Sequence, residues 1–244
     1  MGRFVNTGAD VILKPNICVG YRSYEYAATT NPEVVGTVTR LCREAGARRV
    51  RVMDSPFSGK AAGAYNQSGI EGAVKAAGGE MEIMSNIKYR DVAIPAGKAI
   101  KSWPVYGEIL DADVLINLPI AKHHGSAGLT LGMKNLLGIV KNPNQFHLHG
   151  LHQCIVDLNS ALHPTLTIVD AVRILTRGGP TGGNLDDVKM ANTVIASTDI
   201  VAADAFAATL FGLTGGDIEY IRKSADLGLG SMNMDNIMIE EIDV

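Results

Sequence analysis

The segment from Asp10 to Met53 has the order strand, helix, strand, which restricts the fold more than any other feature of the sequence. Asp10–Leu13 (DVIL) is a short apolar run, and we expect the strand to stop at Pro15, because proline cannot donate to a ladder. Asn31-Pro32-Glu33 is a helix start, and apolar residues then recur at helical spacing as far as Gly46. Arg49–Met53 is the second strand. Such a unit predicts two parallel strands joined by a right-handed crossover.

The rest of the chain continues this alternation. We expect strands at Met81–Met84, Asp113–Leu118, Leu166–Val169, Thr193–Ala196 and Asn236–Ile239. We expect helices at Gly69–Gly78, Pro104–Leu110, Leu151–Leu162, Asp199–Leu210 and Gly215–Leu227, and a hairpin at residues 92–100. The predicted fold is a single α/β domain over residues 1–244, with a mostly parallel sheet, helices on both faces and a small β-hairpin excursion.

Composition excludes several classes of protein. Lys and Arg total 22 against 25 Asp and Glu, so the net charge of −3 does not favour nucleic-acid binding. No apolar run reaches the roughly 18 residues that a membrane helix needs, and we expect no membrane partner. Cys18, Cys42 and Cys154 are too scattered for a disulfide framework or a CxxC metal site, which predicts a reducing, cytoplasmic setting.

All six histidines lie between Asn117 and His163, within one fifth of the chain. This concentration indicates an active or binding region, with the remaining chain as its scaffold. In parallel sheets, ligands bind beyond the carboxyl ends of the strands. The residues that follow the predicted strands are polar, and as anion-binding candidates we take Lys14, Asn16, Asp54, Ser55, Lys122 and Asn135. The alternative is that strand ends turn polar simply because they reach solvent.

The sharpest candidates are Lys122, His123, His124 and Lys134. The linker Gly125–Gly132 is rich in Gly, Ser and Thr, so its backbone N–H groups could approach an anion, together with the positive end of a helix at Leu131–Leu137. The lysines would hold a carboxylate or phosphate, and an imidazole could move a proton. The alternative is a flexible surface loop with solvated lysines. The spacing matches neither a P-loop nor a dinucleotide fingerprint.

His147, His149 and His152 form an HxHxxH pattern. If the first two lie on an extended segment, they point the same way, and three imidazoles could hold Zn, Fe or Ni. Asp170, or Asp157, would be a further ligand or an orienting group. The alternative is that these histidines are surface residues or bond locally.

Several short segments in order along the chain form a recognisable set: LKPN (13–16), TNPEVV (30–35), DSP (54–56), ADVLINLPIAKHHGSAGLTLGMKNLLG (112–138), LHQCIVDLN (151–159), PTLTIVDA (164–171), GGPTGG (178–183) and STDIVAADAFA (197–207). In these segments the sequence resembles the domain-of-unknown-function 362 family. Family members are often joined to iron–sulfur ferredoxin modules or found beside redox proteins, so the resemblance implies redox chemistry with a partner protein. This chain lacks a CxxCxxC segment, and it begins almost at the first strand, where relatives usually have an earlier strand and helix.

We therefore expect a redox-linked enzyme that handles a small anionic substrate or cofactor at the strand ends. Lys14, Lys122 and Lys134 would hold the anion, Lys134 would also act in catalysis, and His123 or His124 would transfer protons. A metal ion, or an iron–sulfur cluster shared with a redox partner, is the expected cofactor class. The arrangement of His124 and Lys134 also resembles lactate racemase, whose nickel-containing organic cofactor is bound through a lysine. The alternatives are thus a racemase- or isomerase-like enzyme, or a non-catalytic ligand or metal carrier.

Overall fold

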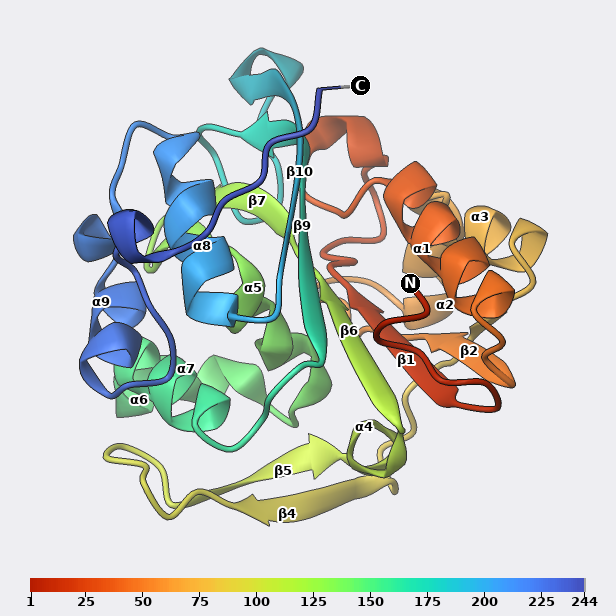
Figure 1. The fold of residues 1–244 in the computed structure, drawn as a ribbon, viewed down its shortest axis with the longest axis horizontal. Coiled ribbons are helices and arrows are strands. Elements are labelled where there is room, and N and C mark those ends of the chain that lie inside the picture. Colours follow the sequence, from red (N-terminus) through yellow and green to blue (C-terminus); the bar gives the residue numbers. More distant parts are fainter. Residues whose placement is uncertain (244) are drawn as a thin grey trace.

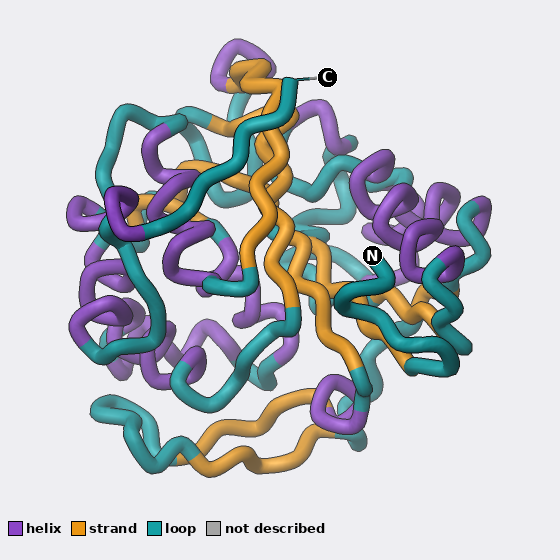
Figure 2. Tube along the Cα trace, viewed as in Figure 1, coloured by secondary structure: helices purple, strands orange, loops and turns teal. Residues whose placement is uncertain are grey.

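A mixed eight-stranded sheet lies at the centre of the computed structural model, which describes residues 1–243. Its order is β3-β2-β1-β6-β9-β7-β8, with β10 paired to β9. The strands are β1 (Asp10–Pro15), β2 (Arg49–Val52), β3 (Glu80–Met81), β6 (Val114–Leu118), β7 (Ile120–His124), β8 (Gly128–Thr130), β9 (Leu166–Leu175) and β10 (Val188–Ser197). Figure 1 shows this sheet running between two groups of helices, and in Figure 2 the strands are coloured orange and the helices purple. The predicted α/β fold with a mostly parallel sheet is confirmed.

The helices cover both faces of the sheet. One face carries α1 (Pro32–Glu44), α2 (Ala61–Gln67) and α3 (Ile70–Ala76), and the other carries α5 (Gly132–Asn135), α7 (Leu151–Asn159), α8 (Ile200–Thr209) and α9 (Glu219–Asp226). The remaining helices, α4 (Gly107–Asp111) and α6 (Phe146–His149), are short. Side chains of β1 alternate between the two cores: Val11 and Leu13 pack with α1, whereas Ile12 packs with the α7–α9 layer.

Local chemistry explains where the longer helices begin. The Asn31 side chain accepts a hydrogen bond from the backbone N–H of Glu33 at the start of α1, and Pro32 occupies the first turn. Asp199 accepts bonds from the N–H groups of Val201 and Ala202 at the start of α8. Both helices were predicted from these capping residues.

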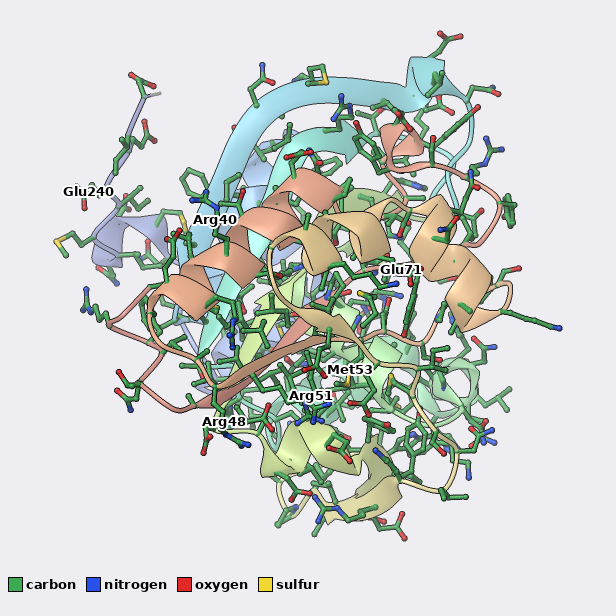
Figure 3. The ribbon with its side chains drawn as sticks, turned by 90° about the vertical axis from the view of Figure 1, so that its right-hand side faces the viewer. Arg40, Arg48, Arg51, Met53, Glu71 and Glu240 are labelled. Atoms are coloured by element: carbon green, nitrogen blue, oxygen red, sulfur yellow. The ribbon has the colours of Figure 1, made fainter. Side chains whose placement is uncertain are left out.

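A two-stranded hairpin, β4 (Tyr89–Ala93) and β5 (Ser102–Tyr106), lies apart from the main sheet. Arg51 of β2 ties it to the sheet, because its guanidinium bonds Asp10, Glu82 and, at 2.5 Å, Glu108 of α4. Arg51 lies directly above the hairpin in Figure 3. The predicted hairpin exists, but its strands start earlier and end later than residues 92–100.

Several predicted boundaries are wrong. Strand β1 continues two residues beyond the predicted run Asp10–Leu13, although it does stop at Pro15 as expected. Residues 120–130 form the antiparallel pair β7–β8 instead of a flexible loop. Beyond Asp170, β9 continues to Leu175 against β10. No strand forms at Asn236–Ile239 within the described chain, where a 3-10 turn covers Met234–Asn236.

Candidate functional site

A cavity of about 540 Å³ opens where β1, β2 and β7 end. It gathers most of the residues that the sequence singles out: Lys14, Asn16, Asp54, Ser55, Lys122, His124, Lys134, Asn135 and His147. These residues come from positions 14 to 147, and the crossovers of the parallel sheet bring them to one edge. The cavity therefore joins the lysine-rich and histidine-rich stretches in one place.

A hydrogen-bonded network forms the floor of the cavity. Lys14 Nζ lies 2.8 Å from Asp54 Oδ1 and 2.9 Å from Asn135 Oδ1, and both charged side chains are buried. Asn135 also receives a bond from Asn16 Nδ2 at 3.0 Å, and its own Nδ2 donates to Asn117 Oδ1 at 2.9 Å. Burial lowers the pKa of Lys14 and raises the pKa of Asp54, while the opposite charge of each partner works against those shifts. The pair contributes no net charge to the cavity.

Lys122 provides a positive charge that no carboxylate of residues 1–243 contacts. Its Nζ donates to Asn16 Oδ1 at 3.0 Å, to the carbonyl of Ala28 at 2.7 Å and to the carbonyl of Pro180 at 2.9 Å. Three acceptors require three N–H groups, which only the ammonium form has. Burial lowers the pKa of Lys122, while the neighbouring Cys18 side chain and the charge of Asp54 work against that shift. The floor thus carries a fixed, uncompensated cation.

Lys134 on α5 has a different environment. Among the described residues, its Nζ takes part in no hydrogen bond or ion pair, although the side chain lines the cavity. Burial, followed by the positive charge of Lys122, lowers the pKa of Lys134 to about 7. A large fraction of this lysine is therefore a neutral amine near pH 7, and its lone pair is available for a proton or a bond.

Strand β7 separates the two neighbouring histidines. Alternation places Lys122 and His124 at the cavity, whereas His123 lies away from it and accepts a bond from Gly179 N on Nδ1 at 3.3 Å. His124 Nδ1 accepts bonds from the N–H groups of Ser126 and Ala127, both at 3.2 Å. The hydrogen of the neutral ring must then be on Nε2. Burial and the nearby lysines lower the pKa of His124 to about 3, so the ring stays neutral.

The backbone N–H groups expected to bind an anion are already occupied. Asp204 on α8 accepts from Gly132 N at 2.6 Å and from Met133 N at 2.9 Å, which caps the start of α5. The amides of Ser126 and Ala127 bond His124. The expectation that this linker and helix end would cradle an anion through their backbone is therefore wrong, and the lysine side chains are the remaining cationic donors.

The four predicted metal ligands do not come together. His147 and His149 lie on helix α6 instead of an extended segment, so they do not share a face at period two. His147 lines the cavity, and His149 stacks edge-on against Trp103. His152 lies 3.7 Å from Glu219, whereas Asp170 accepts bonds from the backbone of Asn31 and Val172.

The other predicted orienting group, Asp157, is also occupied. It accepts bonds from the backbone N–H groups of residues 98–100. Within residues 1–243, no cluster of three or more His, Cys, Asp or Glu side chains is placed to hold a metal ion.

Some cavity residues were not expected from the sequence. Cys18 lines the cavity and its thiol donates to the carbonyl of Pro180 at 3.4 Å. Phe57 and Tyr89 form part of the outer wall. A signal for Phe57 existed in the sequence, because it follows the polar Asp54-Ser55 pair at a strand end. Tyr89 belongs to the hairpin, whose position relative to the sheet no local pattern specifies.

Comparison with known proteins gives the family. The family model described as "Domain of unknown function (DUF362)" matches residues 11–209. The chain belongs to this family. Over 243 residues it is 30% identical to the thylakoid-associated protein sll1697 of Synechocystis sp., a match that covers 94% of this chain and 71% of that protein.

Among solved structures, the fold is similar to the lactate racemase apoprotein from Thermoanaerobacterium thermosaccharolyticum, with a TM-score of 0.51 and 12% identity. That match covers 84% of this chain, which spans about half (49%) of the racemase. At this identity the likeness concerns the fold alone. Among residues 1–243 of the DUF362 chain, none of the helices combines the length and apolar character needed to cross a bilayer.

Proposed function

We propose that this protein is an enzyme that binds a small organic anion in the cavity, moves a proton with Lys134 and stabilises the developing negative charge with a hydrogen bond from His124. The observation that carries this proposal is Lys134, an amine that bonds no other group of the described chain and lies near the charge of Lys122. The neutral Lys14–Asp54 pair leaves Lys122 to dominate the local potential, which favours a carboxylate.

Each residue has a distinct role in this proposal. Lys122 is held by three acceptors and supplies a fixed charge for the anion. Lys134 accepts a proton from the carbon next to the carboxylate or carbonyl, since its pKa of about 7 is matched to neutral pH. His124 donates a hydrogen bond from its Nε2–H to the oxygen where negative charge develops. The ring keeps this proton and remains neutral. The reaction class is proton transfer next to a carbonyl group.

The redox role implied by the family resemblance finds no suitable ligands on this chain. Cys18 lines the cavity, but Cys42 is a buried residue of α1 and Cys154 is a buried residue of α7, so the three thiols belong to separate environments. An iron–sulfur cluster needs several thiolates around one point. The residues do not fit a cluster, and we derive no redox step. The free, buried thiols are consistent with our proposal of a cytoplasmic location.

A second candidate is a racemase- or isomerase-like enzyme with a nickel-containing organic cofactor. Lys134 supports it, because an unpaired amine of lowered pKa can form a covalent bond with an organic group, and the fold likeness is consistent with it. His124 and His147 line the same cavity and are the available imidazoles. Such a group would supply an electron acceptor for chemistry at the substrate carbon.

The first proposal is tested by deuterium exchange. Small 2-oxo and 2-hydroxy acids are incubated with the protein in D₂O, and deuterium at the carbon next to the carboxyl or carbonyl group is measured by NMR. We expect exchange with the native protein, and a loss of about 100-fold or more in Lys134→Met. Lys189→Met, on exposed β10, is the matched control and should exchange normally. Unchanged exchange in Lys134→Met contradicts the role of this lysine.

Intact-mass measurement of protein purified without oxygen distinguishes the second candidate from the first proposal. An added mass that is absent from Lys134→Met supports a covalently bound cofactor, and an unmodified chain with full exchange activity supports the first proposal. Anion binding without exchange for any of these acids would instead favour a non-catalytic carrier.

A further inference from the structure

The cavity has two chemically different zones. Its floor, described above, is polar and buried. Its rim carries two aromatic rings, the exposed Phe57 and the half-buried Tyr89, together with the exposed Lys141 and His147. A bare carboxylate that contacts Lys122 and Lys134 fills only a small part of about 540 Å³, a volume within the range of pockets that hold larger ligands.

Phe57 is held at the rim by its backbone. Its N–H donates to the carbonyl of Cys18 at 2.9 Å, and the nearby Ser55 N–H donates to the carbonyl of Gly138 at 3.1 Å. The side chain is nevertheless 62% exposed. The ring is not packed in the core and therefore offers an apolar surface at the mouth of the cavity. Because the backbone is already held by these hydrogen bonds, a ligand that binds the ring does not have to order a loop.

Tyr89 offers a second ring from a different element. It lies at the start of β4, paired in the ladder with Tyr106, and the two rings meet edge to face with centroids 5.4 Å apart. Lys141 Nζ lies over the Tyr89 ring, 6.0 Å from its centroid. These contacts fix the ring before any ligand arrives.

We infer that the anion bound here carries an aromatic group, which packs against Phe57 and Tyr89 while its charged end reaches Lys122 and Lys134. This inference rests on the proposed function and specifies its substrate class as an aryl-substituted carboxylate or phosphate. The exposed Phe57 ring provides the apolar contact, and Lys122 and Lys134 provide the donors for the charged end. Both requirements are met by residues that line one cavity.

The test compares four probes by calorimetry: acetate, phenylacetate, inorganic phosphate and phenyl phosphate. We expect the phenyl form of at least one anion to bind about tenfold or more tightly than its parent. Phe57→Ser should remove that gain and leave the affinity for the parent anion unchanged. Tyr21→Ser is the matched control, since Tyr21 is similarly exposed but lies outside the cavity, and it should keep the gain.

The outcomes of this test distinguish a failure of the aromatic inference from a failure of the proposed anion-binding function. Equal binding of phenyl and parent anions overturns the aromatic contact while the anion site stands. A phenyl gain that survives Phe57→Ser also overturns it. Failure of all four probes to bind counts against the anion site itself, and the inference falls with it.

Discussion

Asp204 holds the helix that presents Lys134: its two carboxylate oxygens accept the first two backbone N–H groups of α5, at 2.6 and 2.9 Å. The carboxylate is fully buried, and its burial raises the pKa of Asp204 to about 7. A cap from α8, 70 residues further along the chain than Lys134, therefore sets where the unpaired amine lies.

Replacing this cap should destabilise the protein strongly. Asp204→Ala leaves two buried N–H groups without acceptors, and we expect a loss of about 2–4 kcal/mol in the free energy of unfolding. Asp204→Asn keeps one acceptor and should lose about half as much. Urea denaturation measures both. Asp217→Ala removes an exposed cap of a short turn and serves as the control, with an expected loss of about 1 kcal/mol or less. Equal losses at the two positions would contradict the role of Asp204.

Removing Lys134 should stabilise the protein at low pH. Its pKa falls from 10.5 in the unfolded chain to about 7 in the folded one, so between these values the unfolded chain binds the extra proton and stability rises with pH. Below pH 7 the folded chain bears the full cost of a buried ammonium. We expect Lys134→Met to be more stable than the native protein by roughly 1–3 kcal/mol at pH 6 and by less at pH 9.5.

Comparing the native protein with Lys134→Met isolates the contribution of this lysine to stability, because both proteins share all the other titrating groups. Urea denaturation at the two pH values gives the difference. A variant that is less stable than the native protein at pH 6 would mean that Lys134 has a stabilising partner in solution.

The imidazole of His124 should show one tautomer over a wide pH range. Because its Nδ1 accepts two backbone bonds, ¹⁵N NMR should find the proton on Nε2. The pKa near 3 predicts no titration between pH 5 and 8. His124→Asn identifies the resonance by its loss. A proton on Nδ1, or a midpoint near neutrality, would remove the proposed donor.

The buried ion pair in the floor should behave as a coupled unit. Asp54→Asn leaves the Lys14 ammonium without its counter-charge, and we expect a cost of about 3–5 kcal/mol. The same substitution in a Lys14→Met background should cost at least about 2 kcal/mol less, which a double-mutant cycle by urea denaturation measures. Additive losses would show that the two charges do not interact.

The convergence of the cavity residues can be predicted once the parallel strands are recognised in the sequence. Carboxyl ends of parallel strands share one edge, so Lys14 and Asp54, each just after an apolar run, had to lie close together once the strands were recognised. The chain from Asp10 to Met53 carries that information locally, in its apolar spacing and its Asn31 cap.

Other features depend on contacts that no local pattern contains. Asp204 looks like an ordinary residue of an alanine-rich helix until α8 packs beside α5. No strand was predicted between Pro119 and Gly125, and this concealed β7 and the separation of His123 from His124. The turn of helix at His147–His149 likewise cannot be derived from three spaced histidines.

The alternation along β7 limits how this family can change. Inserting or deleting one residue between Pro119 and Lys122 would turn His123 inward and rotate both Lys122 and His124 out, exchanging the cation and the proton donor for a single imidazole. Two-residue changes would preserve the parity. Members that keep this chemistry should therefore differ here in composition far more readily than in length.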